Sequence, residues 1–217
     1  MKGKDFWGPV VWITIHILAA QIKSGNEKYL NRLMWMLTLL LPCDYCKGNL
    51  EKKLKSLDFT KYKGKEQVYW YSYIIHDMAN SHINEMYPDK PPKVSPPLDE
   101  SYEYYSNPDP KFWGPFVWSA IHVLAVALRR ENSEYYREFM HLLVILLPDP
   151  ESSRNLDSFL ENNPINSYLR SNEDTFFYTY MLHDNINKKL GKSSPPYQDV
   201  KSFYFSSMGE ECSDCKI

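Results

Sequence analysis

The sequence contains little glycine, few cysteines and no long apolar run. Only 8 of its 217 residues are glycine, whereas 15% are aromatic, including 17 tyrosines and 6 tryptophans. This balance argues against a loop-rich or low-complexity chain and favours an aromatic-rich helical core. No apolar run approaches the roughly 20 residues that a membrane-spanning helix needs, so we expect no membrane span.

An excess of one charge is also absent. The 25 Lys and Arg and 27 Asp and Glu residues give a formal net charge of -2, and both signs are interspersed along the chain. The sequence therefore offers no basic face, and we expect neither nucleic acid nor a membrane surface among its partners.

The first 20 residues superficially resemble a secretory signal, because an apolar stretch follows a basic start. Trp12 and His16 interrupt that stretch, however, and the same pattern recurs at 111–127 as KFWGPFVWSAIHVLAVA. Since a signal peptide would not be duplicated inside a domain, we expect a soluble protein that is not exported.

The four cysteines form two C-x-x-C pairs, Cys43 with Cys46 and Cys212 with Cys215. Four cysteines are too few for a disulfide scaffold in a chain of this length, and without an export signal such pairs favour redox or metal chemistry. Two other interpretations stay open. The two pairs together supply the four ligands of a zinc site, and Cys43 and Cys46 alone suit small buried apolar positions.

The strongest pattern in the chain is an internal repeat. FWGPVVWITIHILA at 6–19 matches FWGPFVWSAIHVLA at 112–125, an offset of 106 residues. YSYIIHDMAN at 71–80 matches YTYMLHDNIN at 178–187, an offset of 107 residues. The chain therefore consists of two similar copies of one unit.

Only the first copy keeps its cysteine pair. LLPCDYCKGNL at 40–50 matches LLPDPESSRNL at 146–156, where Asp149 and Ser152 stand in place of the two cysteines. We interpret the second stretch as the same helix start in a copy that has exchanged redox chemistry for packing.

Within each copy the apolar residues recur at helical spacing. After the Gly-Pro start, which suits the first turn of a helix, they recur every three or four residues from Val11 to Ala19. The stretches 27–41 and 67–86 predict two more long helices, and the C-x-x-C pair should begin the helix that follows Pro42. No stretch alternates as a strand does. We predict an all-α fold of two tandem bundles with four or five helices each.

The composition changes between the copies. Residues 88–110 are rich in Pro, Ser and acidic residues and are predicted to be a linker. It separates a first domain at 1–87 from a second at 111–200, which a tail at 201–217 follows. Charged runs such as KGNLEKKLKS at 47–56 are interpreted as solvated helix faces.

The predicted position of the cysteine pair favours thiol chemistry. A thiol at a helix N-terminus lies at the positive end of the helix dipole, which favours the thiolate and lowers the thiol pKa. Because C-x-x-C spans about one turn, Cys43 and Cys46 face the same way and can close an exchangeable disulfide.

Three motifs follow one another in order. G-x-x-x-W-x-x-x-H occurs twice, as Gly8, Trp12 and His16 and as Gly114, Trp118 and His122. C-x-x-C follows a proline, and a motif close to H-N-x-V-N-x-x-L-G-K is matched by HDNINKKLGK at 183–192 and less completely by HDMANSHINE at 76–85. In this combination the chain resembles the Erv/ALR family of FAD-linked sulfhydryl oxidases.

The resemblance implies a flavin site inside the first bundle. FAD would lie beside the cysteine pair, held by Gly8, Trp12, His16, His76, Asp77 and Asn80. The same motifs imply a second cofactor site in the second copy, at Trp118, His122, His183, Asn187 and Lys192.

The family's reaction oxidises protein thiols to disulfides. By the resemblance, Cys43 exchanges with the substrate, Cys46 passes electrons to FAD, and molecular oxygen takes them up and becomes hydrogen peroxide. The route needs no metal. Cys212 and Cys215 would be the shuttle dithiol that the family carries on a tail, and nearby acidic residues should raise their thiol pKa values.

The family also implies a quaternary arrangement. Its members commonly form helical dimers, and quiescin sulfhydryl oxidase joins a degenerate copy to an active one. The two bundles here are accordingly expected to form an intramolecular pseudo-dimer, and further association into a homodimer stays open.

Two departures from the family stand out. No cysteines are present for its additional structural disulfide, and the better match to the third motif lies in the copy without the redox pair. The second copy therefore either binds FAD without redox function or keeps the motif for helix packing.

The resemblance favours a viral enzyme of large DNA viruses, which acts in the cytoplasm of the infected cell or in the virion. The mitochondrial intermembrane space is the alternative location. The rival class is a non-enzymatic helical pseudo-dimer that acts as a scaffold or interaction protein.

Overall fold

The computed structural model describes residues 3–208, and the regular secondary structure of that range consists of helices, which confirms the predicted all-α class. The first copy contributes α1 (Lys4–Ala20), α2 (Glu27–Leu40), α3 (Asp44–Ser56), α4 (Lys65–Met86) and α5 (Leu98–Tyr105). The second contributes α6 (Pro110–Val126), α7 (Ser133–Leu146), α8 (Pro150–Asn162), α9 (Asn172–Lys189) and α10 (Tyr197–Met208). Short 3-10 turns, η1 (Phe59–Lys61), η2 (Arg130–Asn132) and η3 (Ile165–Tyr168), lie between them.

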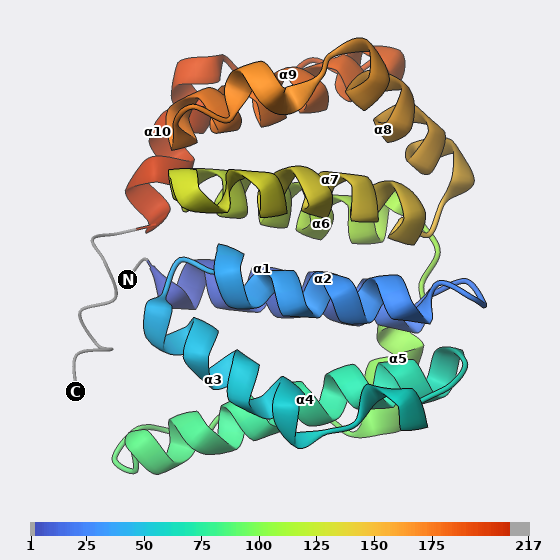
Figure 1. Ribbon diagram of the computed structural model, residues 1–217, viewed down its shortest axis with the longest axis vertical. Coiled ribbons are helices and arrows are strands. Elements are labelled where there is room, and N and C mark those ends of the chain that lie inside the picture. Colours follow the sequence, from blue (N-terminus) through green and yellow to red (C-terminus); the bar gives the residue numbers. More distant parts are fainter. Residues whose placement is uncertain (1–2, 209–217) are drawn as a thin grey trace.

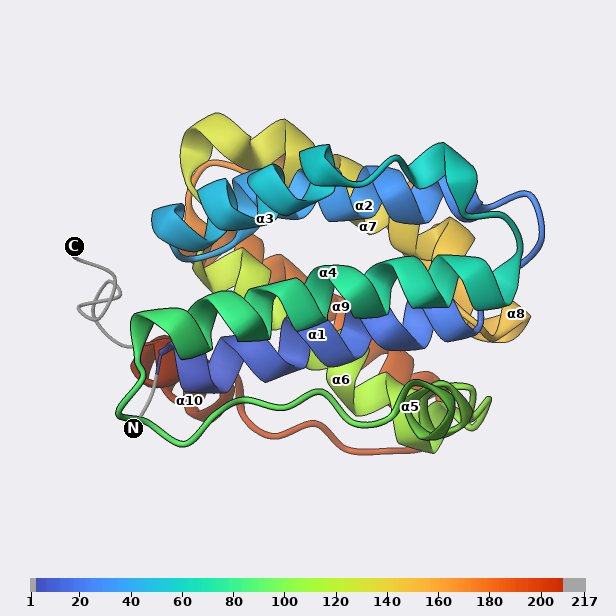
Figure 2. The ribbon, with the colours of Figure 1, turned by 90° about the horizontal axis from the view of Figure 1, so that it is seen from below.

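The long helices stack in layers (Figure 1). α1 and α2 pack against α6 and α7 at the centre, while α3 with α4 and α8 with α9 cover the two outer sides. Figure 2 shows α4 beside α1 and α3 beside α2. The fifth helix of each copy closes the arrangement, since α5 contacts α1 and α4, and α10 contacts α6, α9 and α1.

The first helix begins earlier than the sequence predicts. α1 starts at Lys4, so the Gly8-Pro9 pair lies inside the helix rather than at its start. The backbone N–H groups of Phe6 and Trp7 donate to the carbonyl of Gly3, at 2.9 and 3.1 Å, and this bonding starts the helix. Pro9 is the sixth residue of this helix, and because it has no N–H, one intrahelical bond is missing there. Trp7 of the first turn is buried.

Both regions between and after the bundles contain helix. α5 lies inside the predicted linker at 88–110, where Ser101 is buried and its hydroxyl hydrogen-bonds to that of Tyr69. α10 begins before the predicted tail at 201–217 and ends at Met208. Cys212 and Cys215 lie outside the described residues.

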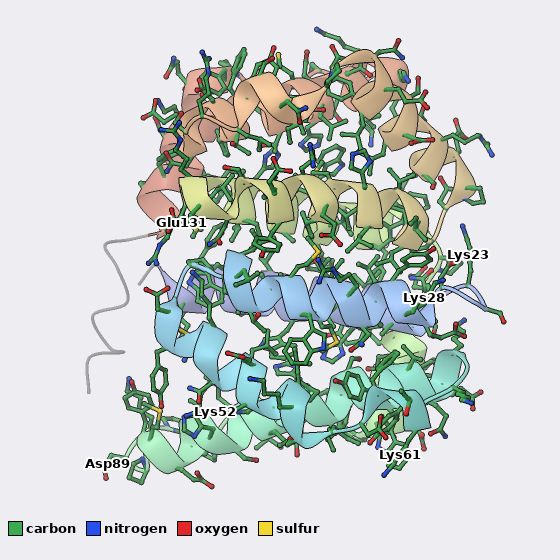
Figure 3. The ribbon with its side chains drawn as sticks, in the orientation of Figure 1. Lys23, Lys28, Lys52, Lys61, Asp89 and Glu131 are labelled. Atoms are coloured by element: carbon green, nitrogen blue, oxygen red, sulfur yellow. A yellow bond between two sulfur atoms is a disulfide. The ribbon has the colours of Figure 1, made fainter. Side chains whose placement is uncertain are left out.

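Apolar and aromatic side chains fill the spaces between the layers, whereas the labelled charged side chains in Figure 3, such as Lys28, Lys61 and Glu131, lie on the outside. Within residues 3–208, no helix is both long enough and apolar enough to cross a membrane.

Candidate functional site

The cysteine pair lies at the start of α3, as predicted. Cys43 is the residue that caps the helix, and it forms a disulfide with Cys46 across a Cα–Cα distance of 5.1 Å. The Sγ atom of Cys43 also accepts the backbone N–H of Cys46 at 3.1 Å. Cys43 is only 3% exposed, whereas Cys46 is partly exposed. The two sulfurs are therefore placed for exchange between disulfide and dithiol at a helix N-terminus.

The second copy keeps this helix start and replaces its chemistry with a hydrogen-bonded cap. Asp149 takes the place of Cys43, and its carboxylate accepts the backbone N–H and the hydroxyl of Ser152, both at 2.7 Å. Asp is among the best N-cap residues, because its side chain satisfies the free N–H groups of the first turn. The second bundle thus keeps a stable α8 without a dithiol.

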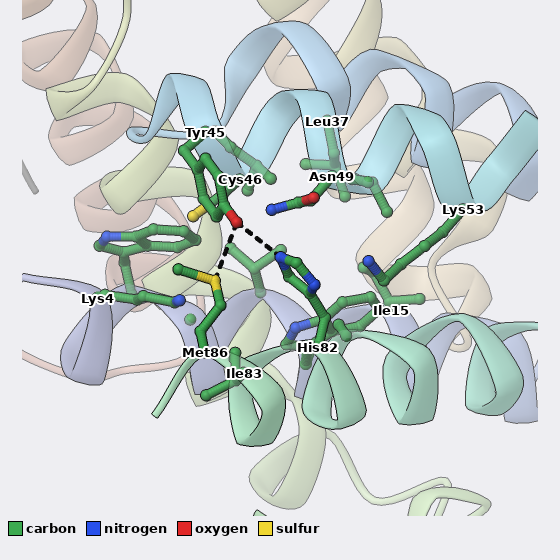
Figure 4. Close-up of a pocket in the computed structure, with 17 residues that line it drawn as sticks. Lys4, Ile15, Leu37, Tyr45, Cys46, Asn49, Lys53, His82, Ile83 and Met86 are labelled. Carbon is green, nitrogen blue, oxygen red and sulfur yellow. Dashed lines mark hydrogen bonds between the residues drawn. The ribbon is translucent and has the colours of Figure 1, made fainter. Parts of the chain in front are cut away.

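A cavity opens beside the disulfide in the first copy (Figure 4). Apolar side chains from α1, α2, α3 and α4 line most of it, and Cys46 forms part of its wall. Gly8 and Trp12 also line it, so the structure brings these two predicted cofactor residues to the redox pair. A Cβ atom added at Gly8 would meet only the side chain of Lys4, at 4.0 Å, so the space beside it is open.

Three residues that the motifs did not indicate close one end of the cavity. The hydroxyl of Tyr45, which stands between the two cysteines, hydrogen-bonds Nε2 of His82 at 2.7 Å and lies 2.9 Å from the sulfur of Met86 (Figure 4). His82 and Met86 belong to the last turns of α4, which has 22 residues against 18 in α9. This contact joins the redox motif to α4.

The cavity also contains a buried lysine. Lys53 is only 9% exposed and lines the cavity, so the interpretation of the run 47–56 as a solvated helix face is wrong at this position. Cys46, Leu50 and Lys53 follow one another at spacings of four and three residues and therefore share one face of α3. That spacing is the signal in the sequence that could have identified Lys53. Its neighbour Lys52 is exposed, as expected.

A chain of hydrogen bonds orders the histidines of the first copy. The Ser72 hydroxyl donates to the carbonyl of Tyr69 at 2.8 Å, so it accepts a bond from Nδ1 of His16 at 3.2 Å. Nδ1 of His16 therefore carries the proton, so its Nε2 accepts a hydrogen bond from Nδ1 of His76, 2.8 Å away. Trp12 stacks on His76 with ring centroids 4.3 Å apart. His76 therefore links the buried His16 to a tryptophan on the cavity wall.

The second copy repeats the same chain. Thr179 donates to the carbonyl of Phe176 at 2.7 Å and accepts from His122 Nδ1 at 2.8 Å. His122 Nε2 lies 3.2 Å from His183 Nδ1, and Trp118 stacks on His183 with centroids 4.0 Å apart. The arrangement of these side chains therefore does not depend on the cysteine pair.

Burial keeps all four of these histidines neutral at neutral pH. It lowers the pKa of His16 and His122 to about 3, helped by the neighbouring imidazole, and that of His76 and His183 to about 4. Neutral imidazoles can each donate and accept one hydrogen bond, as the chain of bonds requires.

The remaining predicted residues contact the segment that follows α4 or α9. The Ser95 hydroxyl donates to Asp77 at 2.9 Å and accepts from Asn80 at 3.1 Å. Asn187 donates to Ser194 at 3.0 Å in the second copy, and its carbonyl accepts the backbone N–H of Lys192 at 2.8 Å. These residues hold the returning chain in place, away from the wall beside Cys46.

The second copy has larger side chains at two positions of the cavity. Phe159 takes the place of Lys53, and Ile186 takes the place of Ala79. One cavity of this copy lies instead between α9 and α10 and includes His122, His183 and Asn187. Trp118 and Lys192 do not line it.

Comparisons with known proteins agree with the motifs. Over 100 residues the chain is 29% identical to the "FAD-linked sulfhydryl oxidase" of one African swine fever virus isolate, which covers 44% of this chain and 82% of that protein. The proteins of the same name from two other isolates are each 28% identical over the same shares of both chains. No family model and no solved structure matches the chain. The predicted resemblance is confirmed: the chain is similar to viral proteins named FAD-linked sulfhydryl oxidase.

Proposed function

We propose that the protein is an FAD-dependent thiol oxidase whose reaction takes place in the first copy. One observation carries the proposal: the Cys43–Cys46 disulfide opens onto a mostly apolar cavity through Cys46. The balanced reaction converts two thiols and O₂ into one disulfide and hydrogen peroxide. Bound FAD would supply the acceptor that takes two electrons and two protons from the dithiol and returns them to oxygen.

The residues at this cavity fit a flavin. A flat, largely apolar ring system suits walls of Val11, Ile15, Leu37 and Leu50, and the open space at Gly8 allows close approach. Trp12 offers an aromatic face, and the N-terminus of α3 points its free N–H groups toward the redox pair. Trp12, with His76 behind it, is proposed to hold the cofactor.

The two cysteines take different roles in this proposal. Cys46 lines the cavity and faces the cofactor, and Cys43 is the partner that exchanges with an incoming thiolate. The incoming thiolate attacks Cys43 Sγ, the Cys43–Cys46 bond breaks, and Cys46 leaves as a thiolate that the helix dipole stabilises. Because Cys43 is 3% exposed, a slim, extended peptide suits this attack better than a folded surface.

The two copies are proposed to form an intramolecular pseudo-dimer. Asn26 donates to the carbonyl of Ile145 at 3.3 Å, and its equivalent Asn132 donates to the carbonyl of Leu39 at 2.9 Å. These are reciprocal contacts between positions 106 residues apart, as a two-fold interface requires. The domain boundaries at 1–87 and 111–200 are proposed with it, and α5 and α10 each serve as the fifth helix of a bundle.

Cys212 and Cys215 are proposed to shuttle electrons within the same chain. The backbone N–H of Gly3 donates to the carbonyl of Ser207 at 2.8 Å, so α10 ends beside the start of α1. Lys4, Trp7 and Gly8 of that first stretch line the cavity at Cys46. Cys212 follows Met208 by four residues, which in an extended chain span at most roughly 14 Å.

The proposal extends to the biological setting. The relatives are viral proteins, which favours a viral enzyme that forms disulfides in the infected cell or the virion over the mitochondrial alternative. Protein thiols are the proposed substrates, and oxygen is the proposed acceptor.

Purified protein tests the proposal directly. We expect a yellow protein with a flavin band near ~450 nm and dithiothreitol-dependent oxygen uptake. Cys46→Ser should abolish the uptake, whereas Ser152→Ala, the equivalent position in the second copy, should leave it unchanged. A colourless and inactive protein would instead support the helical scaffold as its role.

A further inference from the structure

Lys53 carries a positive charge into the cavity without a partner for it. Its side chain extends from α3 toward His82 on α4 (Figure 4), and it is 9% exposed. Within residues 3–208 no carboxylate lies within ion-pairing distance of its Nζ atom. Burying an unpaired ammonium costs free energy, so a persistent one indicates a ligand that carries negative charge.

The other charges around the cavity do not neutralise it. Lys4 also lines the cavity, and none of its lining residues within 3–208 is Asp or Glu. Glu85 and Lys52 act on Lys53 only at a distance, and burial is the largest cause of the lowered pKa of Lys53. The described wall of the cavity therefore combines apolar side chains with the ammonium group of Lys53. A flat apolar ligand that gains negative charge during its reaction suits such a site.

The position of Lys53 along the helix defines which part of the ligand it meets. Seven residues separate Lys53 from Cys46 on the same face of α3, a rise of roughly 10 Å. A planar ring system that meets Cys46 at one edge therefore comes within reach of the long Lys53 side chain at another. The equivalent pair in the second copy is Ser152 and Phe159, so the thiol and the cation are both missing there.

Resting on the proposed function, we propose that Lys53 is a positioning residue that makes the flavin easier to reduce. The dithiol releases two electrons and two protons as its disulfide forms. Bound FAD would accept both electrons and one of the protons, the other proton would leave to solvent, and the ammonium group of Lys53 would balance the single negative charge. In a low-dielectric cavity such a pairing is stronger than in water.

The decisive measurement is the reduction equilibrium of the bound flavin. Wild-type protein and three variants are titrated without oxygen against a reference dye at saturating FAD. Lys53→Met should lower the equilibrium constant for reduction at least about tenfold. Lys53→Arg, which keeps the charge, should stay within about threefold of wild type, and so should Lys52→Met, which removes the exposed neighbouring charge.

A second measurement separates this role from contact with the cofactor's phosphates. If Lys53 contacts a phosphate of FAD, losing it would weaken the binding of the oxidised and reduced forms alike. Lys53→Met would then raise the FAD dissociation constant and leave the reduction equilibrium unchanged. That result would overturn the proposal, as would equal effects of Lys53→Met and Lys52→Met.

Folding gives an independent check without any cofactor. Because Lys53 is buried and forms no ion pair within residues 3–208, Lys53→Met should raise the thermal midpoint of the FAD-free protein, and Lys52→Met should not. A lowered midpoint would show that Lys53 serves packing and would contradict the proposal. If the wild-type protein binds no FAD, the proposed function itself fails, which is a different result from any of these.

Discussion

Arg129 of the second copy forms an ion pair with Asp44, the residue that directly follows Cys43. Its Nη2 atom lies 2.8 Å from Asp44 Oδ2, and Lys47 lies 3.0 Å from the other carboxylate oxygen. The bond to Arg129 is the largest cause of the lowered pKa of Asp44. The second copy, which lacks a redox pair, thus shapes the electrostatics of the first copy's redox motif.

Removing this contact should weaken the thiolate of the reduced pair. In Arg129→Ala the Asp44 charge is less compensated, which raises the pKa of the nearby thiols. Because the Arg129–Asp44 ion pair is exposed, solvent screens its effect, and we expect alkylation of the reduced cysteines at pH 7 to slow by about two- to fivefold. Asp44→Asn should restore the rate in the double variant. An unchanged rate in Arg129→Ala would show that the ion pair does not affect the pKa of the thiols.

Arg32 and Glu138 occupy equivalent positions in the two copies and face each other. Their two bonds measure 2.7 and 2.8 Å. In a homodimer of two identical copies built on this face, Arg32 would face a second Arg32, or Glu138 a second Glu138. We therefore expect Arg32→Glu and Glu138→Arg each to lower the free energy of unfolding by about 0.5–1 kcal/mol, and the double exchange to restore it. Urea unfolding measures this, and additive losses in the double variant would contradict a direct pairing.

Much of the fold follows from local patterns in the sequence. Pro42 stops one helix, and the C-x-x-C pair starts the next, so the location of the redox centre could be predicted. Helix α5 could not be predicted, because it lies in a Pro-rich stretch and its stability comes from packing on α1 and α4.

The site was harder to predict for a similar reason. Charge type alone placed Lys53 on the surface, whereas its spacing from Cys46 places it on the cavity face. The bond from Tyr45 to His82 joins residues 37 positions apart, and no local pattern indicates such a pairing. Nor does the sequence show that His16 has both ring nitrogens bonded inside the protein.

One FAD per chain is expected, because Phe159 and Ile186 take up space that Lys53 and Ala79 leave open in the first copy. Trp12→Ala removes a cavity wall and should weaken FAD binding at least about tenfold. Trp118→Ala removes the equivalent ring and should keep the ratio at one. The ratio of flavin to protein absorbance after gel filtration checks both. A ratio of two for wild type would show that the second copy binds as well.

Four histidines with lowered pKa values, His16, His76, His122 and His183, predict a loss of stability in acid. In the unfolded chain they take up protons as the pH falls below 6.5, whereas in the folded protein they stay neutral to about 4 or 3. The unfolded state binds more protons in that window, so the free energy of unfolding is largest above pH 6.5 and falls with pH below it. Each histidine adds a slope of up to about 1.4 kcal/mol per pH unit.

Urea unfolding between pH 7 and pH 4.5 measures this slope. His122→Gln removes one of the buried imidazoles and should make the pH dependence shallower. His141→Gln removes an exposed one and serves as the matched control. Equal slopes in wild type and His122→Gln would show that this histidine takes up its proton equally in the folded and the unfolded chain.

The tail cysteines should matter for protein substrates and not for small thiols. Cys43 is 3% exposed, so a folded substrate protein cannot approach it closely, whereas dithiothreitol and a short peptide can. Replacing Cys212 and Cys215 by serine should therefore lower the oxidation rate of a reduced protein substrate at least about tenfold and leave dithiothreitol oxidation within about twofold. Cys43→Ser should abolish both reactions. If the tail variant oxidises both substrates at the wild-type rate, the substrate reaches the Cys43–Cys46 pair directly, and the start of α3 must open to admit it.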